Sequence, residues 1–268
     1  MRILALLLAS FLAQASEPVT LHGPLQQGGM IIGQAPPGST VELDGEALRV
    51  SPAGDFVFGF DRDHGRQALL RVLLPDRTTW QQTLAIAPRD YAIQRIDGLP
   101  PKQVTPDPEA LKRIRQEGAM ARAARRTDDP RLDFREAFIW PARGPISGVY
   151  GSQRILNGEP RRPHYGVDVA APTGTPVVAP ASGIVTLAHP DMYFSGGTLI
   201  LDHGHGISSS FLHLIRITVE TGQRVKQGEK IGEIGATGRV TGPHLDWRMN
   251  WFSERIDPQL LVGEMPVE

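Results

Sequence analysis

The sequence contains no cysteine, and this absence limits the chemistry that the protein can use. Disulfides, thiol nucleophiles, iron–sulfur clusters and thiolate zinc sites are excluded, so a bound metal would need histidine and carboxylate ligands. A charge excess is lacking too, because 28 basic residues face 29 acidic residues. Nucleic-acid-binding proteins usually carry a basic excess, so the composition argues against nucleic acid as a partner.

Long apolar runs are also missing, apart from one at the N-terminus. Arg2 precedes residues 3–12, which are nearly all apolar, and the small residues Ala13 and Ala15 flank a cleavage point. This pattern predicts a secretory signal peptide over residues 1–15, and therefore a secreted protein of the periplasm or cell envelope. The run is too short to span a bilayer, which needs about 20 residues. No later stretch is long enough, so we expect no transmembrane span.

Glycine and proline are abundant, with 29 and 23 of the 268 residues, which favours short strands and turns over long helices. Residues 16–89 alternate apolar and polar positions between turn signals. Phe56, Phe58 and Phe60 would share one face of a strand, and Asp44-Gly45 marks a tight hairpin. The spacing predicts a small, Ig-like β-sandwich, in a protein that is mainly β.

Residues 90–136 differ, because they combine a proline-rich linker with a basic helix. Proline disfavours helix at the residue before it, which keeps the first part of this segment extended. Asp107 can cap a helix that has Pro108 in its first position and runs to about Arg126. Its many arginines indicate either a solvated face or attraction to an anionic cell-wall polymer or lipid.

Residues 137–268 hold the candidate chemistry, in a pattern of strands and tight turns that predicts antiparallel β structure. Six of the eight histidines fall between His164 and His244. His164 and Asp168 are four residues apart, and His244 and Asp246 are two apart. On a strand, each pair points to one face, so each pair could reach one ion. Nitrogen and oxygen ligands suit zinc.

The order of several motifs resembles the lysostaphin-type zinc endopeptidases of bacterial cell walls, also called LytM-type domains. The motifs are HYGVD, GTPVVAPASGIV, DHGHG, FLHL, GQRVKQGEKIG and TGPHLD, and the resemblance covers about residues 137–262. It implies an antiparallel metallopeptidase domain of the duplicated hybrid motif type that binds Zn²⁺. It also implies that His164 and Asp168 are zinc ligands and that His213 and His244 are catalytic.

The sequence departs from this family at the third ligand, where Asp246 replaces the usual histidine. Carboxylate is an accepted zinc ligand, and an aspartate oxygen has about the reach of a histidine Nδ1. We therefore expect zinc to be held by His164, Asp168 and Asp246. Two carboxylates would leave the centre less positive than the usual set, which weakens its polarisation of a carbonyl.

Two functions follow from the resemblance. The first is an exported zinc metalloendopeptidase that hydrolyses peptide cross-links of peptidoglycan through a metal-bound water. The alternative is a weak or inactive LytM-type domain that regulates another cell-wall hydrolase, as family members that have lost zinc ligands often do. The presence of His213 and His244 favours the enzyme, because a pure regulator does not need them. The motifs HExxH, G-x-S-x-G and the P-loop are absent, so no other catalytic pattern competes.

Overall fold

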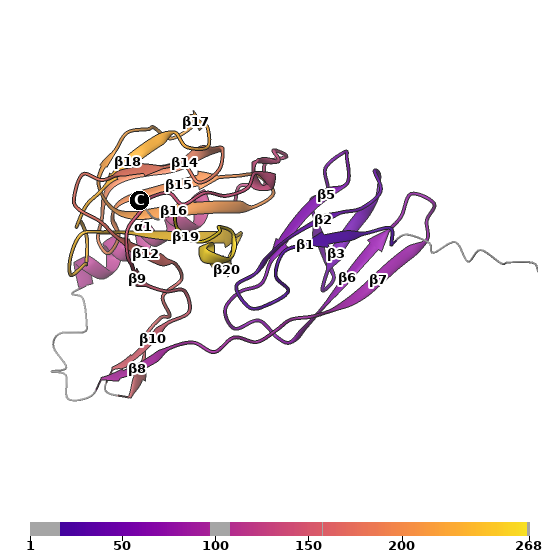
Figure 1. Ribbon diagram of the computed structural model, residues 1–268, viewed down its shortest axis with the longest axis horizontal. Helices are drawn as coiled ribbons and strands as arrows, with labels where there is room; N and C mark the ends of the chain where they lie inside the picture. The colour runs from indigo at the N-terminus through magenta and orange to yellow at the C-terminus, as the bar shows by residue number, and fades with distance from the viewer. Residues whose placement is uncertain (1–16, 97–107, 157, 267–268) are drawn as a thin grey trace, which may run out of the picture.

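The computed structural model describes residues 17–96, 108–156 and 158–266. Its strands form two main regions, a sandwich toward the N-terminus and a large sheet in the C-terminal half (Figure 1). The signal peptide predicted for residues 1–15 lies outside the described residues. Within the described ranges, no helix is long and apolar enough to cross a membrane.

The N-terminal region consists of two small antiparallel sheets that pack face to face, as the sequence predicts. Phe56, Phe58 and Phe60 are fully buried between them. Asp44 and Gly45 have φ values of 51° and 88°, which is the tight-turn geometry that this dipeptide favours. One sheet contains β1 (Thr20–His22), β2 (Met30–Gln34) and β5 (Asp55–Gly59); the other contains β4 (Glu46–Leu48), β3 (Thr40–Leu43), β6 (Gln67–Leu73) and β7 (Thr79–Ala85).

The connecting segment contributes a strand that the sequence analysis did not predict. This strand, β8 (Ile93–Ile96), pairs in parallel with β10 (Gln153–Leu156), which also pairs with β11 (Glu159–Pro160). Its partner is distant in the chain, so no local pattern marks it. The predicted basic helix is α1 (Pro108–Ala124), two residues shorter than expected. The expected cap, Asp107, lies outside the described residues.

The C-terminal region is built around a ten-stranded sheet in which every pairing is antiparallel. This confirms the predicted mainly β fold with an antiparallel C-terminal domain. The main path of the sheet runs through β17 (Arg224–Val225), β14 (Gly183–Met192), β15 (Gly196–Asp202), β16 (Ile207–Ile217), β19 (His244–Trp251), β12 (Val167–Ala170) and β9 (Ile146–Gly148). The other elements are β13 (Pro176–Val178), β18 (Lys230–Ile234), β20 (Glu254–Ile256) and the short 3-10 helices η2 (Asp133–Arg135) and η3 (Pro258–Leu260).

The two faces of this sheet have different roles, because side chains alternate along each strand. Val167 and Val169 of β12 and Leu245 and Trp247 of β19 are fully buried in the main core. The residues between them therefore point to the opposite face, which carries the polar side chains discussed below.

Helix α1 covers part of that second face (Figure 1). Ala124 of the helix belongs to one small apolar cluster with Leu187 of β14 and Ile200 of β15. At the end of the helix, Arg125 donates from Nη2 to Ser210 Oγ of β16 at 3.3 Å. The helix thus lies beside the central strands and forms one wall of the polar face.

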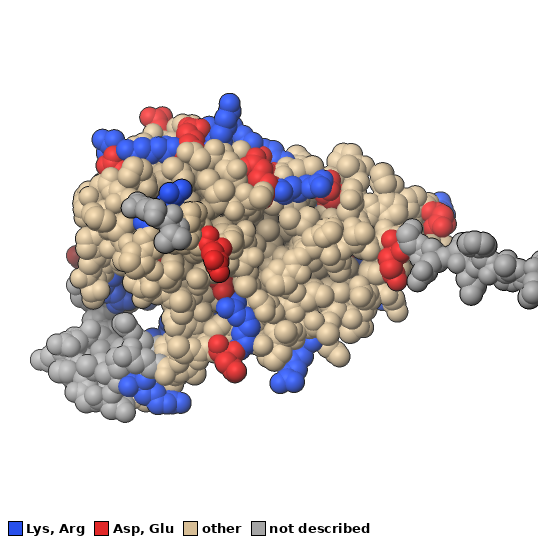
Figure 2. Space-filling model, in the orientation of Figure 1, with Lys and Arg blue, Asp and Glu red and all other residues tan. Residues whose placement is uncertain are grey.

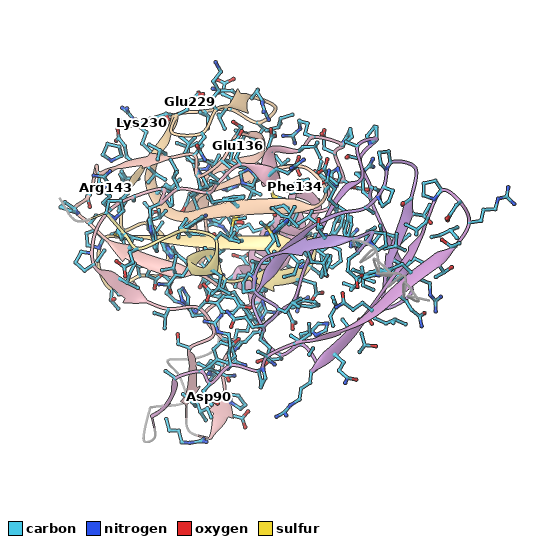
Figure 3. All side chains as sticks on the ribbon, turned by 45° about the vertical axis from the view of Figure 1, so that its right-hand side comes forward. Asp90, Phe134, Glu136, Arg143, Glu229 and Lys230 are labelled. Atoms are coloured by element: carbon cyan, nitrogen blue, oxygen red, sulfur yellow. The ribbon has the colours of Figure 1, made fainter. Side chains whose placement is uncertain are left out.

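The sandwich and the large sheet also contact each other directly. Met30 and Val57 of the sandwich belong to the main core of the sheet region. Phe134, labelled in Figure 3, is fully buried in the same core. Arg89 forms an ion pair with Asp257 at 2.8 Å, which links the two regions further. On the face shown in Figure 2, basic and acidic side chains are interspersed, in keeping with the net charge of −1.

Candidate metal centre

The candidate ligands lie on the polar face of the large sheet, where β12 and β19 pair. Asp168 and Asp246 stand directly opposite each other in this pairing. His164 precedes β12, and its Nε2 atom lies 3.1 Å from Asp168 Oδ1 and 3.6 Å from Asp246 Oδ2. The three ligand atoms lie within 4.8 Å of one another. Two carboxylates facing each other across a strand pair repel unless a cation lies between them, so the arrangement favours a bound cation.

The hydrogen bonds of His164 and Asp168 are also compatible with metal binding. His164 Nδ1 lies 3.2 Å from the Val149 carbonyl oxygen, which places the ring proton there and leaves Nε2 free to bind a metal. His164 Nε2 and Asp168 Oδ1 are buried, and although they lie 3.1 Å apart, neither atom forms a well-aligned hydrogen bond with the other or with a further group. Unpaired buried polar atoms are costly, and a metal ion between these two atoms would satisfy both.

Charge interactions within the site are strong. Burial disfavours protonation of His164, but the Asp168 and Asp246 carboxylates outweigh it and raise the pKa of the imidazole to about 10. Burial also disfavours ionisation of Asp246, but Arg248 and His164 hold the pKa of this carboxyl well below its usual range. Without metal, a proton on His164 therefore takes the place of the cation.

The two predicted catalytic histidines lie together beside these ligands. The rings of His213 and His244 have their centroids 4.9 Å apart, and His244 Nε2 lies 3.9 Å from Asp168 Oδ1. His213 Nδ1 bonds to the Thr237 carbonyl and His244 Nδ1 to the Gly242 carbonyl, each at 2.9 Å. In each ring this leaves Nε2 as the nitrogen available to a substrate.

His213 is held in an uncommon conformation. Its φ of 67° lies in the left-handed region, which non-glycine residues rarely adopt. Burial lowers the pKa of its imidazole, although the bond to the Thr237 carbonyl opposes this shift. A neutral ring in a strained, fixed position is suited to accept a proton.

Glycine in the HYGVD motif allows the close approach of the first ligand segment to the third ligand. A Cβ atom on Gly166 would lie 2.6 Å from Asp246 Oδ1 and 2.6 Å from the Trp247 carbonyl oxygen. A Cβ atom essentially never comes this close to a non-bonded atom, so only glycine fits without displacing Asp246.

The sequence analysis missed Arg248, which contacts a candidate ligand directly. Its Nε lies 2.9 Å from Asp246 Oδ1 and its Nη2 lies 2.5 Å from Asp246 Oδ2. The sequence offered a signal for this contact, because residues 246 and 248 are two apart on a predicted strand, so their side chains share one face. Two other histidines of this region, His203 and His205, are buried and do not belong to the group of candidate ligands.

Comparison with known proteins identifies the relatives of this chain. Residues 162–258 match peptidase family M23, and this range contains all five site residues. Peptidoglycan DD-endopeptidases ShyA and ShyC of Vibrio cholerae are 40% and 44% identical to the chain over 104 and 118 residues, which is 35% and 43% of this chain. The matches span only 24% and 25% of those two relatives.

One solved structure is similar over nearly the whole chain. A crystal structure of a Pseudomonas aeruginosa protein assigned to peptidase M23 is 30% identical, with a TM-score of 0.69, and the match covers 92% of this chain and 96% of that one. The chain belongs to peptidase family M23. M23 peptidases depend on zinc, and zinc accepts the imidazole and carboxylate ligands that this M23 member brings together.

Proposed function

We propose that this M23 protein is an exported zinc metalloendopeptidase that hydrolyses peptide cross-links of peptidoglycan. The observation that carries the proposal is the convergence of one imidazole nitrogen and two carboxylate oxygens within 4.8 Å, beside two imidazoles that each present a free Nε2. The names of ShyA and ShyC, peptidoglycan DD-endopeptidases, support the substrate class.

In this proposal the five site residues divide into ligands and proton carriers. His164, Asp168 and Asp246 hold the zinc. The metal, when bound, supplies Lewis-acid chemistry by activating a water molecule and polarising the scissile carbonyl. His213, kept neutral by burial, accepts the proton of the attacking water. The proton that His213 takes up then passes to the leaving amine, and His244, when it also carries a proton on Nε2, donates a hydrogen bond to the developing oxyanion.

The proposal also covers the domain organisation of the chain and its export. We assign residues 1–15 to a signal peptide and residues 16–89 to the sandwich domain. Residues 90–136 form the linker with its basic helix, and residues 137–268 form the metallopeptidase domain. The signal peptide would export the enzyme to the periplasm or cell envelope, where its substrate lies.

One observation favours a second candidate, the regulation of another cell-wall hydrolase. Arg248 contacts both oxygens of Asp246, so an internal cation already satisfies the third ligand. If Arg248 took the place of the metal, the domain would bind wall peptides without cutting them. The zinc content of the purified protein distinguishes this candidate from the enzyme.

The test compares the full chain with Asp246→Ala, and with Asp76→Ala as an exposed control in the sandwich. We expect about one zinc per chain in the parent and control, and a strong loss in Asp246→Ala, which keeps only two protein ligands. Incubation with isolated sacculi and mass analysis of the products should show new termini within the peptide cross-links.

Two outcomes would contradict the proposal. A parent protein without zinc, inactive on sacculi, would point to the regulatory candidate. Cleavage confined to the glycan strand, or to the bond between glycan and peptide, would show a hydrolase of another bond.

A further inference from the structure

Arg248 and Asp246 form an ion pair whose place in the site suggests a shared role. The two residues alternate along β19, so both side chains lie on the polar face. Arg248 Nε reaches Oδ1 at 2.9 Å and Oδ2 at 3.1 Å, and its Nη2 reaches Oδ2 at 2.5 Å. The Asp246 side chain is 4% exposed and the Arg248 side chain is 25% exposed. Solvent therefore screens the attraction between the two charges only weakly.

Arg248 has no second carboxylate partner among the described residues. Asp246, by contrast, faces two positive groups, Arg248 on one side and the candidate metal position beside His164 on the other. A carboxylate has about four lone-pair positions, so it can accept bonds from a guanidinium and still bind a metal ion. The geometry therefore allows the ion pair and the metal to exist together.

The charges explain why an arginine belongs there. A neutral imidazole and two carboxylates carry two negative charges, which cancel the charge of Zn²⁺. A ligand set with a second histidine in place of Asp246 would leave one positive charge at the centre. Arg248 adds one positive charge next to Asp246, so the pair carries the same net charge as a neutral histidine.

We propose that Asp246 and Arg248 act together as one neutral ligand unit, with Arg248 as a positioning residue that holds the carboxylate and restores the charge of the metal centre. This inference rests on the proposed zinc site and explains how the site can work with aspartate in place of histidine. It makes residues 246 and 248 a matched pair, in which changing one without the other leaves an unbalanced charge beside the metal.

The test is a double-mutant cycle on zinc affinity, measured by competition with a chelator. The proteins are the parent, Arg248→Met, Asp246→His and the double variant Asp246→His/Arg248→Met. In Asp246→His, Arg248 loses its partner and repels the metal, so we expect zinc binding to weaken by at least about tenfold, the usual scale of a change in the residues supporting a metal ligand. Adding Arg248→Met to Asp246→His removes that repulsion, so we expect the affinity to recover by a similar factor.

In the parent, Arg248→Met has two opposing effects on zinc binding, because the site loses a repulsive charge and a positioning contact. We therefore expect a change smaller than the recovery in the Asp246→His background. Two further measurements separate position from charge. Zinc-loaded Arg248→Met should hydrolyse sacculi more slowly than the parent. Arg248→Lys, which keeps the charge but not the two-oxygen contact, should restore part of that rate.

The control variant is Arg216→Met, which removes an arginine of β16 that pairs with Glu233 at 3.0 Å and is largely exposed. It should leave zinc affinity unchanged in both backgrounds. Thermal melting of each metal-free protein checks that the variants fold. If Arg248→Met alone does not fold, the comparison of Asp246→His with the double variant still tests the pairing.

The possible outcomes separate this inference from the proposed function. If the parent binds zinc and Arg248→Met changes the affinity by the same factor in both backgrounds, the residues are not coupled and the inference is wrong. If the parent binds no zinc but Arg248→Met does, Arg248 replaces the metal, and both the inference and the enzyme proposal fail. If none of the four proteins binds zinc, the metal site itself is wrong.

Discussion

Histidines of the C-terminal region fall into two groups, those of the candidate site and the buried His203, which differ in what their ring nitrogens contact. At the candidate metal centre, His164, His213 and His244 each bond to a backbone carbonyl through Nδ1, while Nε2 points toward the site. His203, which directly follows β15, is fully buried, and both its nitrogens are paired, Nδ1 with the Ser182 carbonyl and Nε2 with Ser209 Oγ, each at 2.7 Å.

Their protonation differs accordingly. Burial lowers the pKa of His203 to about 4, so its ring is neutral at physiological pH. At His164 two carboxylates outweigh burial and raise the pKa to about 10. The residue type alone therefore does not mark a site. Here a histidine of the candidate site has one nitrogen bonded to a backbone carbonyl and the other directed to the site, whereas a histidine that serves packing has partners for both nitrogens.

The largest expected effect is the loss of a ligand from the first group. His164→Ala should remove the zinc and reduce hydrolysis of sacculi to background, because only two carboxylate ligands remain. Metal analysis and a sacculus assay on the same preparation check this. If His164→Ala still bound about one zinc per chain, His164 would not be a ligand and would not differ from His203 in its role.

Loss of a proton carrier should affect the rate but not the metal. His213→Ala and His244→Ala should each keep about one zinc per chain and hydrolyse sacculi at least about 100-fold more slowly, the usual scale for general acid–base catalysis. If either variant lost its zinc, that histidine would be a ligand and the assignment of roles would be wrong.

The close approach of Gly166 to Asp246 predicts that a larger residue at position 166 weakens zinc binding. Gly166→Ala places a methyl group 2.6 Å from Asp246 Oδ1, so the carboxylate must move. We expect zinc affinity to fall about 10- to 100-fold, as when a ligand loses its support. Gly242→Ala is the matched control, because a Cβ there meets no atom within 4 Å. Equal affinities in the two variants would show that the contact with Asp246 does not matter.

The raised pKa of His164 gives a prediction about pH. Zinc must displace a proton whose pKa is about 10, so zinc affinity should rise about tenfold per pH unit between pH 7 and 9. Calorimetry in buffers of different ionisation enthalpy should show about one proton released per zinc. Binding that does not change with pH would contradict a protonated His164 in the metal-free protein.

The smallest effect on function is expected from the buried group. His203→Ala should lower the free energy of unfolding by about 1–3 kcal/mol, because Ser209 and the Ser182 carbonyl lose their partner. Zinc content and hydrolysis should stay at the parent level. Loss of zinc from this variant would show that His203 belongs to the site after all.

His203 should also affect the acid stability of the protein. Its folded-state pKa of about 4 lies below the unfolded value of about 6.5, so the unfolded chain binds more protons between these values. This group therefore reduces stability as the pH falls from about 6.5 to 4. Denaturant melts of His203→Ala should show a shallower loss of stability in that window, and an identical slope would contradict a buried neutral ring.

The sequence predicted much of the fold and the members of the candidate site. The sequence predicted that His164 and Asp168 share one strand face, as do His244 and Asp246, and the structure has Asp168 and Asp246 on the same face of paired strands. The order of motifs indicated the family, and the start of α1 followed from proline at its first position. These features are local. Side-chain direction alternates every residue along a strand, and proline suits the first position of a helix because an amide there has no partner within the helix.

Which of these residues meet depends on the pairing of strands that are distant in the chain. The register of β12 against β19 puts Asp168 opposite Asp246, and it brings His164 and Gly166 close to that carboxylate across a long stretch of chain. The same folding gives Arg248 its partner and pairs β8 with β10. Strand pairing between distant segments depends on the packing of the whole chain, which no local pattern records. Local sequence patterns therefore set the strand faces and the chemical groups on them, whereas long-range strand pairing sets the candidate centre that these groups form.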